Sequence, residues 1–183
     1  MMSRKYKFLN KEGLYFVSFA TVYWLDVFVR DIYFDLVVRS LDYCRKEKGM
    51  EIYAWCVMTS HVHLIFRSKN NDPSTLIKSL KTFTSRQLQS LIEQNNQESR
   101  KEWLLWLMER SGAKNSNVKK RQFWQQHNKP IEVWSARVIS QKLDYLHNNP
   151  VEAGFVFEPE HWKYSSAIDY VGGKGLLEID YLE

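Results

Sequence analysis

Two histidines separated by a single residue, in the segment His61-Val62-His63, are the sharpest chemical feature of the sequence. The apolar and β-branched residues around them predict a strand over 61–67, and alternate residues of a strand point to the same face. Both imidazoles can therefore converge on one divalent metal ion, for which neutral imidazole is a common ligand. Taken alone the pattern is weak. It is equally typical of two half-buried histidines on a sheet, or of the zinc or iron site of a metallohydrolase or cupin.

A tyrosine followed four residues later by an asparagine is the second candidate feature. Tyr145 and Asn149 would stack on one face of a continuing helix. However, Pro150 disfavours helical geometry at the residue before it. We therefore expect a helix over 138–147 that ends at the Asn-Asn-Pro sequence, which leaves the direction of Asn149 open. On spacing alone, Tyr145 is one of ten tyrosines and could be an ordinary helix residue.

The elements that must position these side chains form a mixed pattern. Helices and strands alternate, with a hairpin turn at 59–60, which predicts an α+β fold with a largely antiparallel sheet. The order is compatible with a ferredoxin-like β-α-β-β-α-β arrangement with helices packed on the sheet. We expect strands at 14–23, 51–58, 61–67, 123–124 and 133–134, and further helices at 31–48, 71–94 and 103–108, with an exposed basic loop at 111–121.

The length of 183 residues fits a single domain, 1–183, with a core at about 12–157 and a tail at about 158–183 that wraps over the surface. The sequence has neither an apolar run long enough for a bilayer nor a secretory signal, so we expect no membrane partner and a cytoplasmic, nucleoid-associated protein. Its two cysteines, Cys44 and Cys56, are too few for a disulfide framework, and both are expected to be reduced core residues.

Positive charge is concentrated in the first two thirds of the chain. Residues 71–130 contain 11 Lys and Arg against 5 Asp and Glu, whereas residues 131–183 contain 4 against 9. Such a distribution attracts a polyanion, although a solvated helix face would have the same composition. Trp124 and Trp134 could stack on unpaired bases or could be core residues. The candidates for phosphate contacts are Lys78, Lys81, Arg86, Lys119, Lys120 and Arg121.

The two chemical segments together are far more specific than either one. The sequences MTSHVHLIF at 58–66 and YLHNNPVEAG at 145–154, followed by WKYSSA at 162–167, resemble the REP-associated tyrosine transposases. This branch belongs to the insertion-sequence-200-like group of single-tyrosine HUH transposases. The resemblance covers nearly the whole chain.

The resemblance implies a ferredoxin-like core with the HUH histidines on a central strand and a tyrosine-bearing helix lying across it. It implies His61, His63 and Asn149 as ligands of a divalent metal ion, Mg²⁺ or Mn²⁺, and Tyr145 as the nucleophile. The family cuts and rejoins single-stranded DNA near imperfect hairpins, through a 5′-phosphotyrosine and a free 3′-hydroxyl. Some relatives are dimers, so a homodimer is one expectation for this chain.

Two other functions remain open from the sequence. A catalytically idle, domesticated DNA-hairpin-binding protein would keep the fold and lose the need for Tyr145. A metallohydrolase would use the His pair and a water nucleophile on a small substrate, but the strand offers no nearby Glu as a third ligand. The intact set of His61, His63, Tyr145 and Asn149 favours the DNA-cleaving enzyme.

Overall fold

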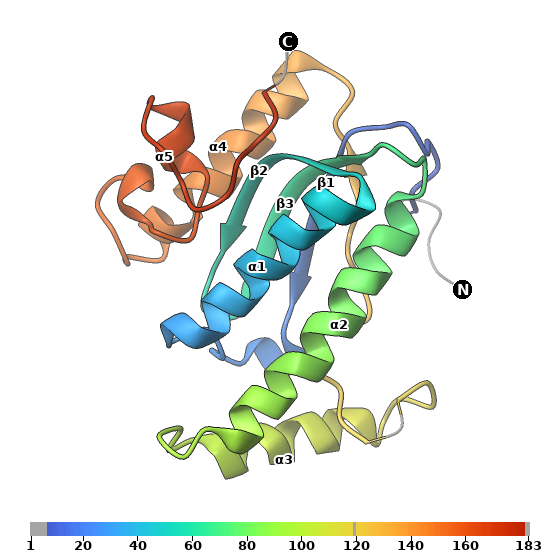
Figure 1. The fold of residues 1–183 in the computed structure, drawn as a ribbon, viewed down its shortest axis with the longest axis vertical. Coiled ribbons are helices and arrows are strands. Elements are labelled where there is room, and N and C mark those ends of the chain that lie inside the picture. The colour runs from blue at the N-terminus through green and yellow to red at the C-terminus, as the bar shows by residue number, and fades with distance from the viewer. Residues whose placement is uncertain (1–6, 119, 182–183) are drawn as a thin grey trace.

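The computed structural model describes residues 7–118 and 120–181 and folds them around one sheet (Figure 1). The strands are β1 (Tyr15–Ala20), β2 (Met50–Val57), β3 (His61–Ser68) and β4 (Ile131–Glu132). They lie in the order β2-β3-β1-β4, and each neighbouring pair is antiparallel. The predicted α+β class is therefore confirmed, and β3, which begins with the His pair, is an inner strand.

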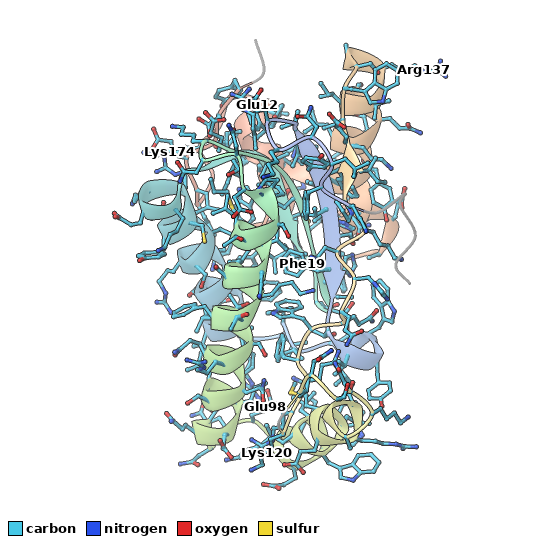
Figure 2. The ribbon with its side chains drawn as sticks, turned by 90° about the vertical axis from the view of Figure 1, so that its right-hand side faces the viewer. Glu12, Phe19, Glu98, Lys120, Arg137 and Lys174 are labelled. Atoms are coloured by element: carbon cyan, nitrogen blue, oxygen red, sulfur yellow. The ribbon has the colours of Figure 1, made fainter. Side chains whose placement is uncertain are left out.

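Helices cover both faces of the sheet. α1 (Asp31–Lys48) and α2 (Pro73–Gln94) pack on one face, and α4 (Ala136–Glu152) packs on the other, as the edge-on view in Figure 2 shows. α3 (Lys101–Gly112) follows α2 and lies at one end of the molecule (Figure 1). In residues 7–118 and 120–181, no helix combines the length and apolar character needed to cross a membrane.

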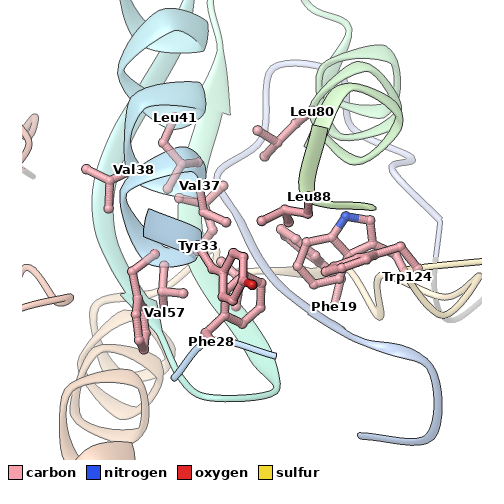
Figure 3. Close-up of a cluster of buried hydrophobic side chains, with 14 of the residues drawn as sticks. Phe19, Phe28, Tyr33, Val37, Val38, Leu41, Val57, Leu80, Leu88 and Trp124 are labelled. Atoms are coloured by element: carbon pink, nitrogen blue, oxygen red, sulfur yellow. The ribbon is translucent and has the colours of Figure 1, made fainter. Parts of the chain in front are cut away.

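Both faces of the sheet are apolar, and this fixes the side to which the histidines point. Phe19 of β1, Leu41 of α1 and Leu88 of α2 belong to the larger buried cluster, shown in Figure 3. Val62 belongs to the same cluster, whereas Ile65 belongs to a second cluster beneath α4. Full burial of an aliphatic or aromatic side chain contributes about 1.5–3 kcal/mol. A shift of β3 by one residue would therefore turn each of its buried side chains to the opposite face of the sheet, and it is strongly disfavoured.

The predicted helix signals are confirmed. α1 ends at Gly49, whose φ of 68° is a left-handed conformation that glycine adopts without strain. At the start of α2, the side chain of Asp72 accepts a hydrogen bond from the backbone N–H of Thr75, and Pro73 occupies the first helical position. The hairpin between β2 and β3 closes with a backbone hydrogen bond of 2.8 Å from Met58 to His61.

Several predicted boundaries are wrong. The first strand ends at Ala20 rather than at residue 23, because residues 22–24 form a short 3-10 helix. Residues 123–124 form no strand, because only Trp124 makes a bridge, to Thr21. The last strand is 131–132 rather than 133–134, since Ser135 already caps α4. Helix α4 does not end before Pro150 but continues to Glu152. Pro150 removes only one hydrogen bond near the helix end, and the N–H of Ala153 still bonds to the carbonyl of Asn149.

The C-terminal tail does more than wrap over the surface. The N–H of Val57 donates to the carbonyl of Tyr164 at 2.8 Å, and the N–H of Ser166 donates to the carbonyl of Trp55 at 2.9 Å. Tyr164 and Ser166 are buried. The tail therefore covers the outer edge of β2, whose unpaired backbone groups would otherwise be exposed.

Buried Glu98 ties the first residues of α1 and α3 together. Its carboxylate accepts hydrogen bonds from Arg30 at 3.3 Å and Arg100 at 3.0 Å, and Arg100 also donates to the carbonyl of Asp26. Burial raises the pKa of Glu98, but the hydrogen bonds and charge of Arg100, with help from Arg30, outweigh it and bring the pKa down to about 2. The folded state therefore favours the ionised carboxylate.

We expect Glu98→Gln to lower the free energy of unfolding by about 2–3 kcal/mol at pH 7, because two arginines lose their anion. The stabilisation exists above the ordinary pKa of about 4.5 and disappears as the pH falls through about 2, so the difference from wild type should shrink on acidification. Urea unfolding at several pH values measures this. Exposed Glu102 at the start of α3 is the matched control, and an equal loss in Glu102→Gln would contradict the prediction.

Candidate active site

The His pair lies at the start of β3 and faces α4. His63 is flanked in the sheet by Ser18 of β1 and Cys56 of β2, and it is only 2% exposed. His61 is half-buried at the edge of the same face. Both cysteines are unpaired and buried, as predicted, and burial raises the pKa of each thiol. The cysteines are therefore inert, and the polar character of this face comes from the histidines.

Three side chains from distant parts of the chain surround the imidazoles. The rings of His61 and His63 lie 4.7 Å apart, edge to face. Nε2 of His61 lies 3.2 Å from Oδ1 of Asn149, and the ring of Tyr145 lies 5.2 Å from that of His63. Phe16 stacks on His63 at 5.5 Å and fixes its plane. The structure thus brings together the four residues that the sequence singled out.

The continuation of α4 through Pro150 makes this arrangement possible. It keeps Asn149 one turn after Tyr145, so both side chains face the histidines. His147 points into the core instead, where its Nε2 lies 2.9 Å from Oγ of buried Ser166. The spacing of the helix therefore selects Tyr145 and Asn149 for the site and excludes the histidine between them.

Burial keeps the imidazoles neutral. It lowers the pKa of His61, more than the hydrogen bond of Asn149 and the charge of Asp26 raise it. Burial, followed by the charges of His61 and Lys142, lowers the pKa of His63 to about 3. Within the described part of the chain, neither ring nitrogen of His63 has a hydrogen-bond partner. A neutral imidazole has one nitrogen with a free lone pair and one N–H group, and burying either without a partner is costly. The lone pair of the unprotonated nitrogen can bind a metal ion.

Besides the two imidazoles, the side chain at this site that could bind a metal ion is the carboxamide of Asn149. No group of three or more His, Cys, Asp and Glu side chains able to hold a metal occurs in residues 7–118 and 120–181. A site built from His61, His63 and the carbonyl oxygen of Asn149 has few protein ligands and leaves positions for substrate oxygens. This composition is unlike the carboxylate-containing sites of zinc hydrolases.

Two neighbours of the site were not predicted. Nζ of half-buried Lys142 lies 5.7 Å from the centre of the Tyr145 ring and 5.2 Å from that of Phe16. Trp24 lies 5.4 Å from His61, edge to face, and is 54% exposed. Lys142 could have been found, since it precedes Tyr145 by three residues on a predicted helix. No sequence signal connects Trp24 with His61.

Five of the six predicted phosphate contacts line one groove of about 820 Å³ between α2 and the segment 115–128. The sixth, Lys119, lies outside the described residues. The groove lies on the α2 side of the sheet, whereas the His pair faces α4. Lys78, Arg86 and Lys120 are exposed and form no ion pair with any other described residue.

The other two cations of the groove already have protein partners. Nζ of Lys81 donates to the carbonyl of Gln125 at 2.7 Å and to Oδ1 of Asn128 at 2.6 Å, and burial lowers its pKa to about 8. Arg121 forms ion pairs with Glu93 and Glu109. Both residues therefore fix the segment 121–128 in place. Their contact with DNA stays a prediction.

The two tryptophans proposed to stack on unpaired bases differ in their exposure to solvent. Trp124 is 5% exposed, and its indole N–H donates to Oγ1 of Thr84 at 3.0 Å, so it is a core residue. Trp134, which precedes α4, is 80% exposed. It lies beyond the strand end opposite to the His pair, because β4 pairs with Tyr15 and Phe16 whereas His61 pairs with Ala20.

The part of the sequence that contains the His pair matches a known family of transposases. Residues 15–109 match the family model described as "Transposase IS200 like", and the chain belongs to that family. The matched range contains the His pair but ends before Tyr145. The position of Tyr145 beside the histidines is thus an independent observation of the structure.

Two of the proteins that match over most of the chain are REP-associated tyrosine transposases. A Haemophilus influenzae protein assigned as a REP-associated tyrosine transposase is 26% identical over 167 residues, which are 90% of this chain and 85% of the relative. The solved structure of a REP-associated tyrosine transposase bound to a REP hairpin shares the fold, with a TM-score of 0.66 at 17% identity, covering 100% of this chain and 92% of that one. A Deinococcus radiodurans structure assigned as a transposase has a TM-score of 0.45 at 20% identity, over 81% of this chain and 96% of its own.

Proposed function

We propose that this protein cleaves and rejoins single-stranded DNA near hairpins, with Tyr145 as the nucleophile and a divalent metal ion at His61, His63 and Asn149. One observation carries the proposal. A tyrosine on α4 lies 5.2 Å, ring to ring, from a buried, neutral histidine whose two nitrogens have no partner among the described residues. The family membership supplies the reaction class.

The donor set fits a metal ion that binds phosphate. Two imidazole nitrogens and one amide oxygen suit Mn²⁺, and Mg²⁺ is the alternative that phosphoryl chemistry commonly uses. When bound, such a cation neutralises negative charge on the non-bridging oxygens of a phosphate. Phe16 holds the plane of His63 by stacking at 5.5 Å. Oδ1 of Asn149 lies 3.2 Å from Nε2 of His61, so the two atoms are close enough to be offered to one ion.

In the proposed step, Oη of Tyr145 attacks the phosphorus atom and the bond from phosphorus to the 3′ oxygen breaks. The proton leaves the phenol and a proton is gained by the departing oxygen, which gives a 5′-phosphotyrosine and a free 3′-hydroxyl. Rejoining reverses the exchange with a second 3′-hydroxyl. The number of phosphoester bonds is conserved, so the reaction needs neither ATP nor water.

Lys142 is the group that we propose to assist Tyr145. The ammonium group lies 5.7 Å from the centre of the Tyr145 ring and has no acidic partner among the described residues. Its positive charge can attract a phosphate towards the tyrosine. It is therefore a positioning residue, because it makes and breaks no bond in the reaction.

We expect Lys142→Ala to slow cleavage roughly ten-fold near pH 7 and Lys142→Arg to restore most of the rate. The deficit should shrink as the salt concentration rises, because salt screens the attraction between the ammonium group and the phosphate. Single-turnover rates at several salt concentrations measure this effect. A deficit that is the same at every salt concentration would indicate a purely structural role and contradict the assignment.

The cations of the groove are proposed to hold the backbone of a DNA hairpin. A solved structural neighbour is bound to a REP hairpin, and here Lys78, Arg86 and Lys120 are exposed on one groove. Such contacts fix the position of the duplex without reading its sequence. The scissile phosphate would lie near the histidines, on the face of the sheet that α4 covers.

The experiment incubates the purified protein with single-stranded hairpins from the DNA flanking its gene, with Mn²⁺, Mg²⁺ or EDTA, and resolves the products on a denaturing protein gel. A slower-migrating protein–DNA band that requires the metal supports the proposal. Hairpin binding without a covalent band under any condition would instead favour the domesticated binding protein. Strand hydrolysis without an adduct would favour a metallohydrolase.

A further inference from the structure

We infer that the turn η2 (Val22–Trp24) and the hollow beside it form a subsite for unpaired nucleotides that flank the scissile phosphate. This inference rests on the proposed DNA substrate. It assigns residues that hold bases, in addition to those that hold the metal and the backbone.

The turn presents two consecutive aromatic rings in a strained backbone conformation. Tyr23 and Trp24 both have φ of 55°, a left-handed conformation that is unfavourable for bulky residues, and they are 46% and 54% exposed. Val22 and Leu25 on either side are buried, and Oγ1 of Thr21 bonds to the carbonyl of Leu25 at 2.8 Å. Such strain persists only where the surroundings impose it, and it is concentrated at functional sites.

The aromatic turn is continuous with the metal site. The ring of Trp24 lies 5.4 Å from that of His61. A base stacked on Trp24 would therefore be attached to a phosphate close to the proposed metal ligands. Tyr23, which precedes Trp24 in the chain, borders a hollow of about 720 Å³. Its polar lining includes Lys114, Asn117, Gln125, Gln126 and His127.

The backbone places this hollow at the same end of the sheet as the His pair. Ala20 of β1 pairs with His61 on one side, and on the other side its carbonyl accepts a hydrogen bond of 2.8 Å from the N–H of Gln125. The two residues are thus separated by two strand spacings, roughly 10 Å. Gln125 and Asn117 also line the basic groove, so the hollow adjoins the groove.

The chemistry of the hollow suits nucleobases. The carboxamides of Asn117 and Gln126 are exposed and make no hydrogen bond to a described residue, and such amides pair with base edges. Nζ of Lys114 lies 6.0 Å from the centre of the Tyr23 ring, where it can neutralise a phosphate beside a stacked base. Aromatic faces, free amides and a cation together fit an unpaired nucleotide better than an apolar peptide.

The test compares a hairpin carrying its natural unpaired flank with the same hairpin cut blunt. Binding is measured by fluorescence anisotropy with the full chain carrying Tyr145→Phe, so that no cleavage intervenes. We expect Tyr23→Ala and Trp24→Ala to weaken binding of the flanked hairpin roughly ten-fold each and to leave the blunt hairpin unchanged. Trp24→Phe should retain most of the affinity, because it keeps an aromatic face.

Two controls separate base stacking from other causes. Trp134→Ala removes a more exposed tryptophan at the opposite end of β1 and should have no effect. A hairpin whose flank has abasic sites should bind the protein with an unsubstituted turn as weakly as the natural flanked hairpin binds Trp24→Ala. Combining the abasic flank with Trp24→Ala should cause no further loss of affinity. Equal weakening on flanked and blunt hairpins, or no weakening, would overturn the inference.

The outcome is distinguishable from failure of the proposed function. If the protein with intact Tyr145 forms no covalent adduct but its binding depends on the flank, the proposed cleavage is contradicted and the nucleotide subsite is supported. If Tyr23→Ala and Trp24→Ala, each with Tyr145 intact, form the adduct on the flanked hairpin at the wild-type rate and bind that hairpin with wild-type affinity, the chemistry is supported and the subsite is overturned. No binding to either hairpin would overturn both.

Discussion

Tyr145→Phe is expected to abolish the metal-dependent protein–DNA adduct, a loss of roughly 10⁴-fold or more, while hairpin affinity stays within about two-fold of wild type. The substitution removes only the phenolic oxygen. That oxygen forms no hydrogen bond with a described residue, and Tyr145 is 44% exposed, so the free energy of unfolding should change by less than about 0.5 kcal/mol. The ring remains against His63 and Phe16.

The measurement combines the denaturing gel with mass spectrometry of the modified peptide. Tyr43 of α1 is the matched control, because it is 55% exposed and distant from the His pair in sequence and on the other side of the sheet. Tyr43→Phe should form the adduct at the wild-type rate. An adduct that persists in Tyr145→Phe, or that maps to another residue, would assign the nucleophile elsewhere.

The second large effect concerns the metal ligands. We expect His63→Ala to lose at least roughly 100-fold in Mn²⁺ affinity and to lose the adduct, because no other described side chain replaces its nitrogen. Asn149→Ala should weaken Mn²⁺ binding by a smaller factor, roughly ten-fold, since the one oxygen donor among the three protein ligands is lost. Calorimetric titration with Mn²⁺ alone measures both, independently of DNA.

Controls keep this prediction decisive. His63 is 2% exposed, so its truncation leaves a cavity and can destabilise the sheet. Asn149→Ala changes a half-buried helix residue to a strong helix former, and it tests the same site with the sheet intact. Exposed His161→Ala should leave Mn²⁺ binding unchanged. Wild-type Mn²⁺ affinity in a folded Asn149→Ala and in a folded His63→Ala would exclude the proposed metal site.

Local periodicity accounts for most of the elements that could be predicted. The alternation of β3 put His61 and His63 on one face, and the helix signals at Gly49 and Asp72 were local and correct. The prediction failed at Pro150, where a general preference against helix before proline was weaker than packing of α4 on the sheet. Short strands near 123–134 were also misplaced, because two or three residues carry too little pattern to fix a boundary.

The sequence by itself determined the chemical groups, the two imidazoles on alternate strand positions and the tyrosine followed four residues later by an asparagine. It fixed the common face of the two imidazoles, whereas Pro150 left the direction of Asn149 open. Only the tertiary structure decided that these two pairs meet, since the contact between His61 and Asn149 spans 88 residues. It also brought Lys142 and Trp24 to the site and tied Lys81 to the chain itself. Periodicity sets the side of an element to which a residue points, whereas burial of both apolar sheet faces sets which element it then meets.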